Sequence, residues 1–145
     1  VKLGCTACDM VVNIGAVKDK NYELVRHEIS EFVRICGEGC DTKLIFEVGF
    51  LTDEEIAELT RICCECGVTY VKTATGSQAF PTLDQVKIMK ANLSWNTKIK
   101  VSWLPRTFTM PAVLHMFEHM GVSLVGTRSA GKLVEEYSKY LEELK

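Results

Sequence analysis

An apolar, β-branched run, Val68-Thr-Tyr-Val-Lys-Thr-Ala-Thr-Gly76, carries one lysine, Lys72, at its centre. The pattern is typical of a buried strand in a parallel sheet, with a loop opening at its carboxyl end. A buried ammonium group is costly because it leaves water without a fixed partner. Lys72 therefore has two interpretations: a side chain that extends to solvent, or a neutral amine that attacks a carbonyl.

Strand and helix patterns alternate along the whole chain on both sides of this run. The expected strands cover residues 5–14, 43–50, 68–76, 97–103 and 122–125, and the expected helices cover 21–36, 52–66, 82–93, 109–120 and 131–145. Thr52 and Glu55 have the spacing of a capping box at the start of the second helix. The chain thus reads as five βα units in succession.

This alternation predicts an α/β fold, with a parallel sheet and right-handed crossovers, in one domain over residues 1–145. Both a doubly wound open sheet and a TIM (β/α)8 barrel have this pattern. A complete barrel needs about 250 residues, so five units would make only part of one.

The composition excludes several classes of partner. The formal net charge is −2 and there is no basic block, so no nucleic-acid partner is expected. No apolar run approaches the roughly 20 residues of a membrane span, and the first residues do not have the pattern of a signal peptide. No membrane partner is therefore expected. The seven cysteines are expected to be reduced thiols of a cytoplasmic protein.

Two cysteine pairs have the spacing of zinc ligands, Cys5-x-x-Cys8 and Cys63-x-x-Cys66. In a strand, however, the side chains of Cys5 and Cys8 would point to opposite faces. We therefore expect structural thiols and no metal site. The three histidines are expected at the surface.

Three ionisable residues lie within apolar strand patterns: Asp9 in the first strand, Lys72 in the third and Lys100 in the fourth. If all three point to the inner face, their charges meet in one interior. Desolvation and repulsion between two lysines in a low-dielectric site lower the pKa of one of them. A neutral amine is what Schiff-base formation requires, and a nearby aspartate can transfer protons. The three residues together favour the chemical interpretation of Lys72.

Four segments resemble deoxyribose-phosphate aldolase in the correct order, over essentially the whole chain. They are Asp9-Met-Val-Val-Asn-Ile-Gly15, Phe46-Glu-Val-Gly49, Val71-Lys-Thr-Ala-Thr-Gly76 and Val125-Gly-Thr-Arg-Ser129. The resemblance implies a TIM barrel in which the five strands are the fourth to the eighth. The N-terminal units would then be absent, which agrees with a chain that begins at Val1 without methionine.

The resemblance also implies an activity, the reversible cleavage of 2-deoxy-D-ribose 5-phosphate to glyceraldehyde 3-phosphate and acetaldehyde. By this likeness Lys72 is the Schiff-base lysine of a class I aldolase. Lys100 matches the second lysine, which perturbs the first, and Asp9 matches the aspartate of the proton relay. No metal or other cofactor is implied, and the partner is a small phosphorylated aldehyde sugar.

One segment departs from the family pattern. The family has Gly-Gly after the fourth strand, where this chain has Trp103-Leu104-Pro105 before Arg106, and proline offers no amide to a phosphate. The expected substrate or phosphate contacts are Thr75, Gly76, Ser77, Gly126, Arg128 and Ser129. Two alternatives stay open: an aldolase-like binding or scaffolding module without the reaction, and an aldolase for a different, unphosphorylated aldehyde.

Five parallel strands leave two open edges and an uncovered interior face. We therefore expect the 145-residue segment by itself to be insoluble, to associate into a homo-oligomer or to be inactive.

Overall fold

Within the described residues of a computed structural model, 1–78, 80–94, 96–102 and 109–144, five parallel strands form one sheet. The strands are β1 (Ala7–Val11), β2 (Asp41–Ile45), β3 (Tyr70–Lys72), β4 (Lys98–Ser102) and β5 (Val122–Gly126). Each strand pairs with the next one along the chain, so the sheet order is the sequence order. This order is that of βα units wound in one direction, as in a barrel, and the predicted α/β fold is confirmed.

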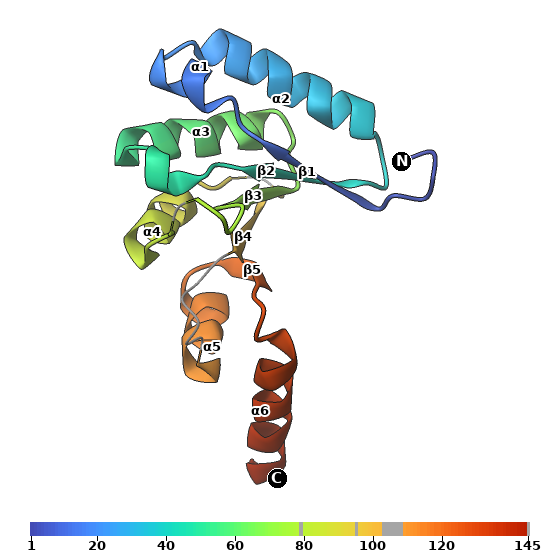
Figure 1. Ribbon diagram of the computed structural model, residues 1–145, viewed down its shortest axis with the longest axis vertical. Coiled ribbons are helices and arrows are strands. Elements are labelled where there is room, and N and C mark those ends of the chain that lie inside the picture. Colours follow the sequence, from blue (N-terminus) through green and yellow to red (C-terminus); the bar gives the residue numbers. More distant parts are fainter. Residues whose placement is uncertain (79, 95, 103–108, 145) are drawn as a thin grey trace.

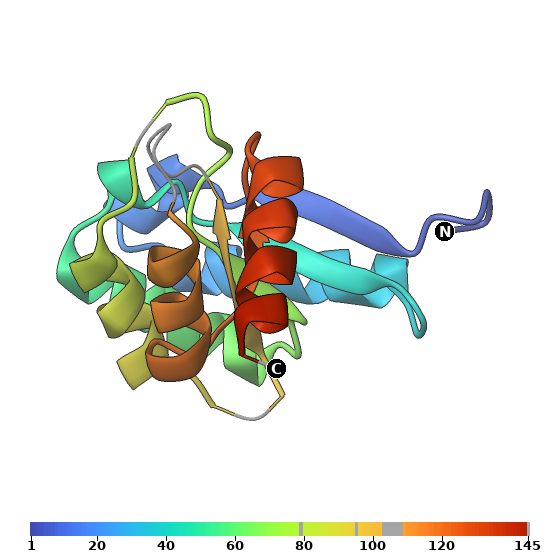
Figure 2. The same cartoon turned by 90° about the horizontal axis from the view of Figure 1, so that it is seen from below.

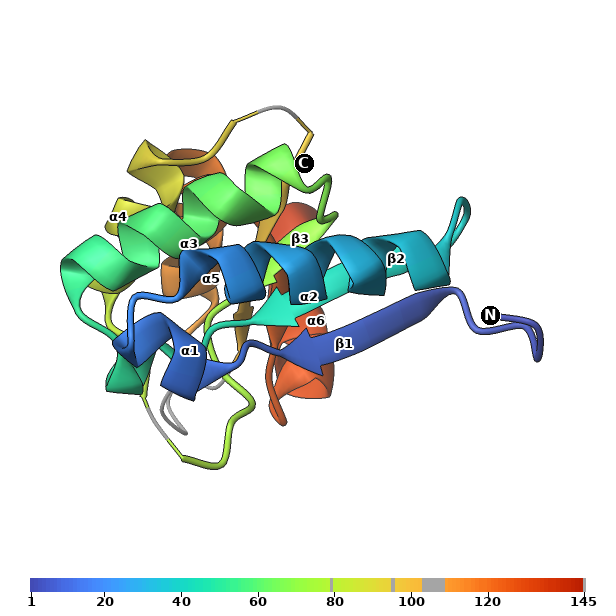
Figure 3. The ribbon, with the colours of Figure 1, turned by 90° about the horizontal axis from the view of Figure 1, so that it is seen from above.

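Helices connect the strands and lie on one side of the curved sheet (Figure 1). They are α1 (Ile14–Lys18), α2 (Tyr22–Cys36), α3 (Asp53–Glu65), α4 (Leu83–Ala91), α5 (Met110–His119) and α6 (Ala130–Glu143), with a 3-10 turn, η1 (Val48–Phe50), after β2. Seen from above, α2 lies over β2 and runs alongside β1, and α3 lies next to α2 (Figure 3). Capping boxes begin α3 at Thr52 and α4 at Thr82, the first of them as predicted.

Three strands are clearly shorter than predicted: β3 covers only Tyr70–Lys72, and β1 and β2 each end early for a local reason. The first ends at Val11 because Asn13 caps α1, its side chain accepting a hydrogen bond from the Ala16 amide at 3.1 Å. The second ends at Ile45 because Glu47 adopts a left-handed backbone conformation, with φ of 51°. The chain after Glu47 therefore turns into η1 instead of continuing the strand to Phe50.

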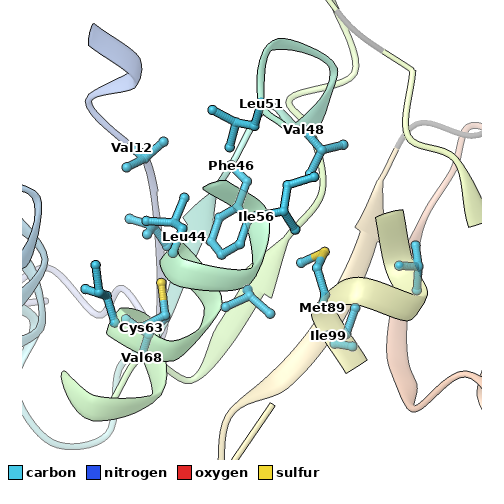
Figure 4. Packing of buried hydrophobic residues seen from close by; sticks show 14 of the residues in the cluster. Val12, Leu44, Phe46, Val48, Leu51, Ile56, Cys63, Val68, Met89 and Ile99 are labelled. Carbon is cyan, nitrogen blue, oxygen red and sulfur yellow. The ribbon is translucent and has the colours of Figure 1, made fainter. Parts of the chain in front are cut away.

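The core lies between the helices and one face of the sheet (Figure 4). Leu44, Val71 and Ile99, which are neighbours across three strands, are fully buried. Ile56 of α3 and Met89 of α4 pack against this layer and are also fully buried. Each such side chain contributes roughly 1.5–3 kcal/mol when it leaves water. Apolar residues therefore fill the helix-facing side of the sheet, and the charged strand residues point to the other face.

The opposite face and both edges of the sheet are open. Val11 on β1 and Leu124 on β5 are 43% and 37% exposed, and neither edge strand has a second partner among the described residues. The N-terminus extends away from the sheet beyond β1 (Figure 2). Among the described residues, no helix has both the length and the apolar character to cross a membrane.

Candidate active site

An ion pair occupies the open face of the sheet, where side chains from β1 and β3 meet. Lys72 Nζ donates a hydrogen bond to Asp9 Oδ2 at 2.7 Å. The Lys72 side chain is only 11% exposed, whereas that of Asp9 is 35% exposed. The alternation of side chains along a strand explains the contact, because Asp9 and Lys72 both point away from the helices. The amine thus lies in a shielded position with one fixed partner.

Two further lysines lie around Asp9 on the same face. Lys43, aligned with Asp9 in the β1–β2 register, places its Nζ 3.8 Å from Asp9 Oδ1 and is 10% exposed at its side chain. Lys100 is aligned with Lys72 in the β3–β4 register. One aspartate therefore lies within a group of three lysines, and the excess positive charge makes the face attractive to an anion.

This arrangement changes the ionisation of two of the groups. Burial alone would raise the pKa of Asp9, but the hydrogen bond from Lys72 and the charges of Lys72, Lys100 and Lys43 lower it. Burial, together with the charge of Lys72, lowers the pKa of Lys100, and Asp9 only partly opposes that effect. Asp9 is thus held as a carboxylate, and Lys100 releases its proton more readily than an ordinary lysine.

The loop after β3 is fixed by a buried carboxylate. Glu47 is 3% exposed, and its Oε2 accepts a hydrogen bond from the Thr75 amide at 3.1 Å. Among the described residues, Glu47 Oε1 has no hydrogen-bond partner. The hydroxyls of Thr75 and Ser77 bond to each other at 2.9 Å. The loop that follows Lys72 is therefore anchored to the end of β2.

The end of β5 comes very close to β4. A Cβ built on Gly126 would lie 2.7 Å from Ser102 Oγ and 3.7 Å from Lys100 Cε, so a larger residue there would require the Ser102 side chain to move. Beyond it, the Ser129 amide donates to Thr127 Oγ1 at 3.1 Å, and the Arg128 side chain is exposed. Because Gly126 has no side chain, the space beside Ser102 and Lys100 stays open.

The expected phosphate contacts form two separate groups, at residues 75–77 and 126–129. Both groups follow strands of a parallel sheet and lie at the same end of it (Figures 2 and 3). The amides of Thr75, Ser77 and Ser129 already donate hydrogen bonds within the chain. Trp103-Leu104-Pro105 and Arg106 lie outside the described residues.

Two residues beside the site, Lys43 and Glu47, were not among the expected site residues. Lys43 shares the alternation of Ile45 in its strand, and a parallel register with β1 puts it beside Asp9. The sequence alternation therefore put Lys43 on the same face as Ile45, but its place beside Asp9 could be found only from the strand register. Glu47 lies in the Phe46-Glu-Val-Gly49 segment of the family resemblance, but the residue pattern did not predict its burial, which depends on the left-handed turn that ends β2.

The chain as a whole resembles proteins of known sequence and structure. No family model matches the chain. The deoxyribose-phosphate aldolase of Thermococcus kodakarensis is 37% identical over 134 residues, which are 91% of this chain and 58% of that protein. The deoxyribose-phosphate aldolase of Dictyoglomus turgidum is 37% identical over 140 residues, 96% of this chain and 62% of that protein.

Solved structures agree with the sequence relatives. An aldolase named QR15 superimposes with a TM-score of 0.85 at 31% identity, over 99% of this chain and 64% of QR15. The deoxyribose phosphate aldolase of Aeropyrum pernix, described as a unique tetrameric structure, superimposes with a TM-score of 0.77 at 25% identity, over 94% of this chain and 57% of that one. The chain thus spans somewhat more than half the length of these relatives. It is a homologue of the deoxyribose-phosphate aldolases and corresponds to part of their TIM barrel.

Proposed function

We propose that this chain carries the imine-forming site of a class I aldolase that reversibly cleaves 2-deoxy-D-ribose 5-phosphate to glyceraldehyde 3-phosphate and acetaldehyde. The observation that carries the proposal is the shielded Lys72 amine, 2.7 Å from Asp9, with Lys100 aligned beside it. The names of the sequence relatives support the substrate. In this proposal Lys72 is the nucleophile and Asp9 and Lys100 transfer protons.

The first stage joins the amine to the aldehyde. Asp9 Oδ2, which accepts the hydrogen bond from Lys72, is placed to take the proton that the amine must lose before it attacks C1. The carbinolamine that forms loses its hydroxyl as water, and this step needs a proton. Lys100 can supply that proton because its pKa is lowered by burial and by the charge of Lys72.

The second stage breaks the C2–C3 bond. Its electron pair moves into the protonated imine and leaves an enamine on Lys72, while the C3 hydroxyl loses its proton and becomes the aldehyde of glyceraldehyde 3-phosphate. Protonation of the enamine carbon and hydrolysis then release acetaldehyde and regenerate the amine. The positive charge of the imine draws the electrons, so a covalent bond to Lys72 supplies the electrophilic catalysis.

The phosphate end is proposed to lie at the carboxyl ends of β3 and β5. The residues are Thr75, Gly76, Ser77, Gly126, Arg128 and Ser129. Support comes from their common end of the sheet and from the exposed Arg128 guanidinium, which can hold a phosphate by two parallel hydrogen bonds. Since the sequence departs from the family pattern at Trp103-Leu104-Pro105, an unphosphorylated aldehyde is the second candidate substrate.

Trapping with borohydride tests the imine directly. A protein that carries this chain in a complete barrel is incubated with acetaldehyde and borohydride, and its peptides are mapped by mass spectrometry. We expect one ethyl group on Lys72 and none in a Lys72→Met variant. Lys98→Met is the matched control, since Lys98 is an exposed lysine on the neighbouring register position. Modification spread over surface lysines, with none concentrated at Lys72, would refute the assignment.

The two substrate candidates separate in a comparison of 2-deoxyribose 5-phosphate with 2-deoxyribose. A phosphate site predicts faster cleavage of the phosphorylated sugar, and an Arg128→Met variant that loses part of this preference. Equal rates for both sugars would favour the unphosphorylated aldehyde. Absence of cleavage and of trapping would favour the binding or scaffolding alternative.

We further infer a cytoplasmic location and a role in the breakdown of deoxyribose phosphate. The seven free cysteines support a reducing compartment. A homo-oligomeric state is also proposed, and the tetrameric structure described for the Aeropyrum pernix protein supports it.

A further inference from the structure

Four of the seven cysteines gather at the N-terminal ends of β1 and β2. Cys5 precedes β1, Cys8 lies in it, Cys36 ends α2 and Cys40 directly precedes β2. Cys8 Sγ lies 3.5 Å from Cys5 Sγ and 3.7 Å from Cys40 Sγ. The sulfurs of Cys5, Cys8 and Cys40 all lie within 4.8 Å of one another. The strand begins only at Ala7, so the expectation that Cys5 and Cys8 would point to opposite faces was wrong.

A fourth thiol, that of Cys36, adjoins this group from the end of α2. It interacts with the thiols of Cys8 and Cys40, but it lies outside the set of sulfurs that are all within 4.8 Å of one another. Cys36 is 5% exposed and Cys40 is 7% exposed. The group therefore has a buried side, from α2 and the start of β2, and an exposed side at Cys5.

The backbone explains why two distant pairs of cysteines meet. Gly37 and Gly39, with φ of 67° and 80°, allow the short turn that reverses the chain between α2 and β2. The parallel register then aligns Cys8 with Thr42, close to Cys40. Neither feature involves the open face of the sheet, and Asp9, the neighbour of Cys8, points to that other face.

The spacing of the sulfurs is that of ligands around one ion. Four thiolates at about 2.3 Å from a zinc ion lie about 3.8 Å from one another in a tetrahedron. The Cys5–Cys8 and Cys8–Cys40 sulfur separations, 3.5 and 3.7 Å, are close to this value, whereas a disulfide needs about 2.05 Å. The sequence spacing, Cys-x2-Cys followed by Cys-x3-Cys, is also that of structural zinc sites. Thiolates disfavour Mg²⁺ and Ca²⁺, which prefer oxygen ligands.

We propose that the thiolates of Cys5, Cys8 and Cys40 bind one structural Zn²⁺ ion, and that Cys36, which adjoins Cys8 and Cys40, completes the tetrahedron when the ion binds. Binding converts the thiols to thiolates and releases their protons to solvent, with no change of oxidation state. The ion would fasten the exposed segment before β1 to the turn between α2 and β2, at the edge of the sheet. Residues 1–6 are otherwise exposed and are held to β2 through the bond from the Asp41 amide to the Thr6 carbonyl, at 2.9 Å.

Metal analysis and cobalt substitution test this site in the purified protein. We expect one zinc per chain, and after exchange with Co²⁺ we expect sulfur-to-cobalt charge-transfer absorption and the visible bands of tetrahedral cobalt. A chelator should lower the melting temperature, because an ion that binds only the folded state stabilises it. The site also predicts loss of zinc in acid, since protons compete for the thiolates.

Variants separate this site from unspecific binding to thiols. Cys5→Ser changes an exposed residue, so the fold should survive, but the ion should be lost at a lower chelator concentration. Cys40→Ser should abolish stoichiometric binding. Cys66→Ser is the matched control, because the Cys66 thiol lies beside Ser30 of α2, outside the group of close sulfurs, and its loss should leave the zinc content unchanged.

Three results would overturn the proposal. They are cobalt binding without charge-transfer absorption, zinc content equal in Cys5→Ser, Cys40→Ser and Cys66→Ser, and a chain with no bound metal that melts at the same temperature with and without added Zn²⁺. None of these measurements depends on aldolase activity, so the zinc site and the proposed reaction can fail separately.

Discussion

A charged Lys100 destabilises the folded protein, and the same environment makes Lys100 a better proton donor in the proposed reaction. Its pKa is lowered by burial and by the charge of Lys72, so the folded protein binds this proton less tightly than the unfolded chain does. The charged form therefore destabilises the fold below the folded pKa. That penalty disappears as the pH rises from the folded pKa towards the ordinary value of 10.5.

A Lys100→Met variant should accordingly melt at a higher temperature than the parent at neutral pH. The difference should shrink as the pH approaches the ordinary lysine pKa, and proton transfer should slow by about 10²–10⁴-fold. Circular dichroism melts across this pH range and trapping rates at Lys72 measure both effects. Lys98→Met controls for the loss of a positive charge from the same face. A lower melting temperature for Lys100→Met at neutral pH would contradict this account.

At the scale of elements, Glu47 couples the end of β2 to the loop after β3. Its carboxylate holds the Thr75 amide, three residues beyond Lys72. Glu47→Ala should cost about 1.5–3 kcal/mol, the usual contribution of a hydrogen bond to a charged group, and should slow imine formation by misplacing the loop.

Glu47→Gln is the matched variant, because its amide oxygen can still accept the bond from Thr75. It should retain most of the stability and of the trapping rate, as measured by urea denaturation and by the borohydride assay. If Gln and Ala lower both quantities equally, the charge of Glu47 matters and the anchoring of the loop does not.

The elements also show how far the sequence leads. The alternation of strands and helices, the capping box at Thr52 and the common face of Asp9 and Lys72 follow from local patterns and from side-chain parity. Lys43 needs the register between β1 and β2, and the Cys5–Cys40 cluster needs the length of α2 and the turn after it. Such contacts depend on how the strands and helices pack against one another, and local sequence patterns do not predict this packing.

At the scale of the whole molecule, the open sheet predicts association. β1 and β5 each leave one edge unpaired among the described residues, and Val11 and Leu124 expose apolar surface on the open face. On α6, Val134 is 65% exposed, and its neighbours Tyr137 and Leu141 are also exposed. An unpaired strand edge beside exposed apolar side chains is a template for another chain.

Residues 1–145 expressed alone should therefore form oligomers, seen by size-exclusion chromatography with light scattering, and their melting temperature should rise with protein concentration. Val11→Lys places a charge on the edge strand and should shift the population towards monomer. Leu24→Lys is the matched control, since Leu24 is 38% exposed on α2, a helix that covers the other side of the sheet. If both variants and the parent are monomeric with one sharp melting transition, the strand edges do not drive association. The five βα units would then fold stably by themselves. If Leu24→Lys dissociates the oligomer as strongly as Val11→Lys, the contact lies on the helical surface and the open edge of β1 is not its cause.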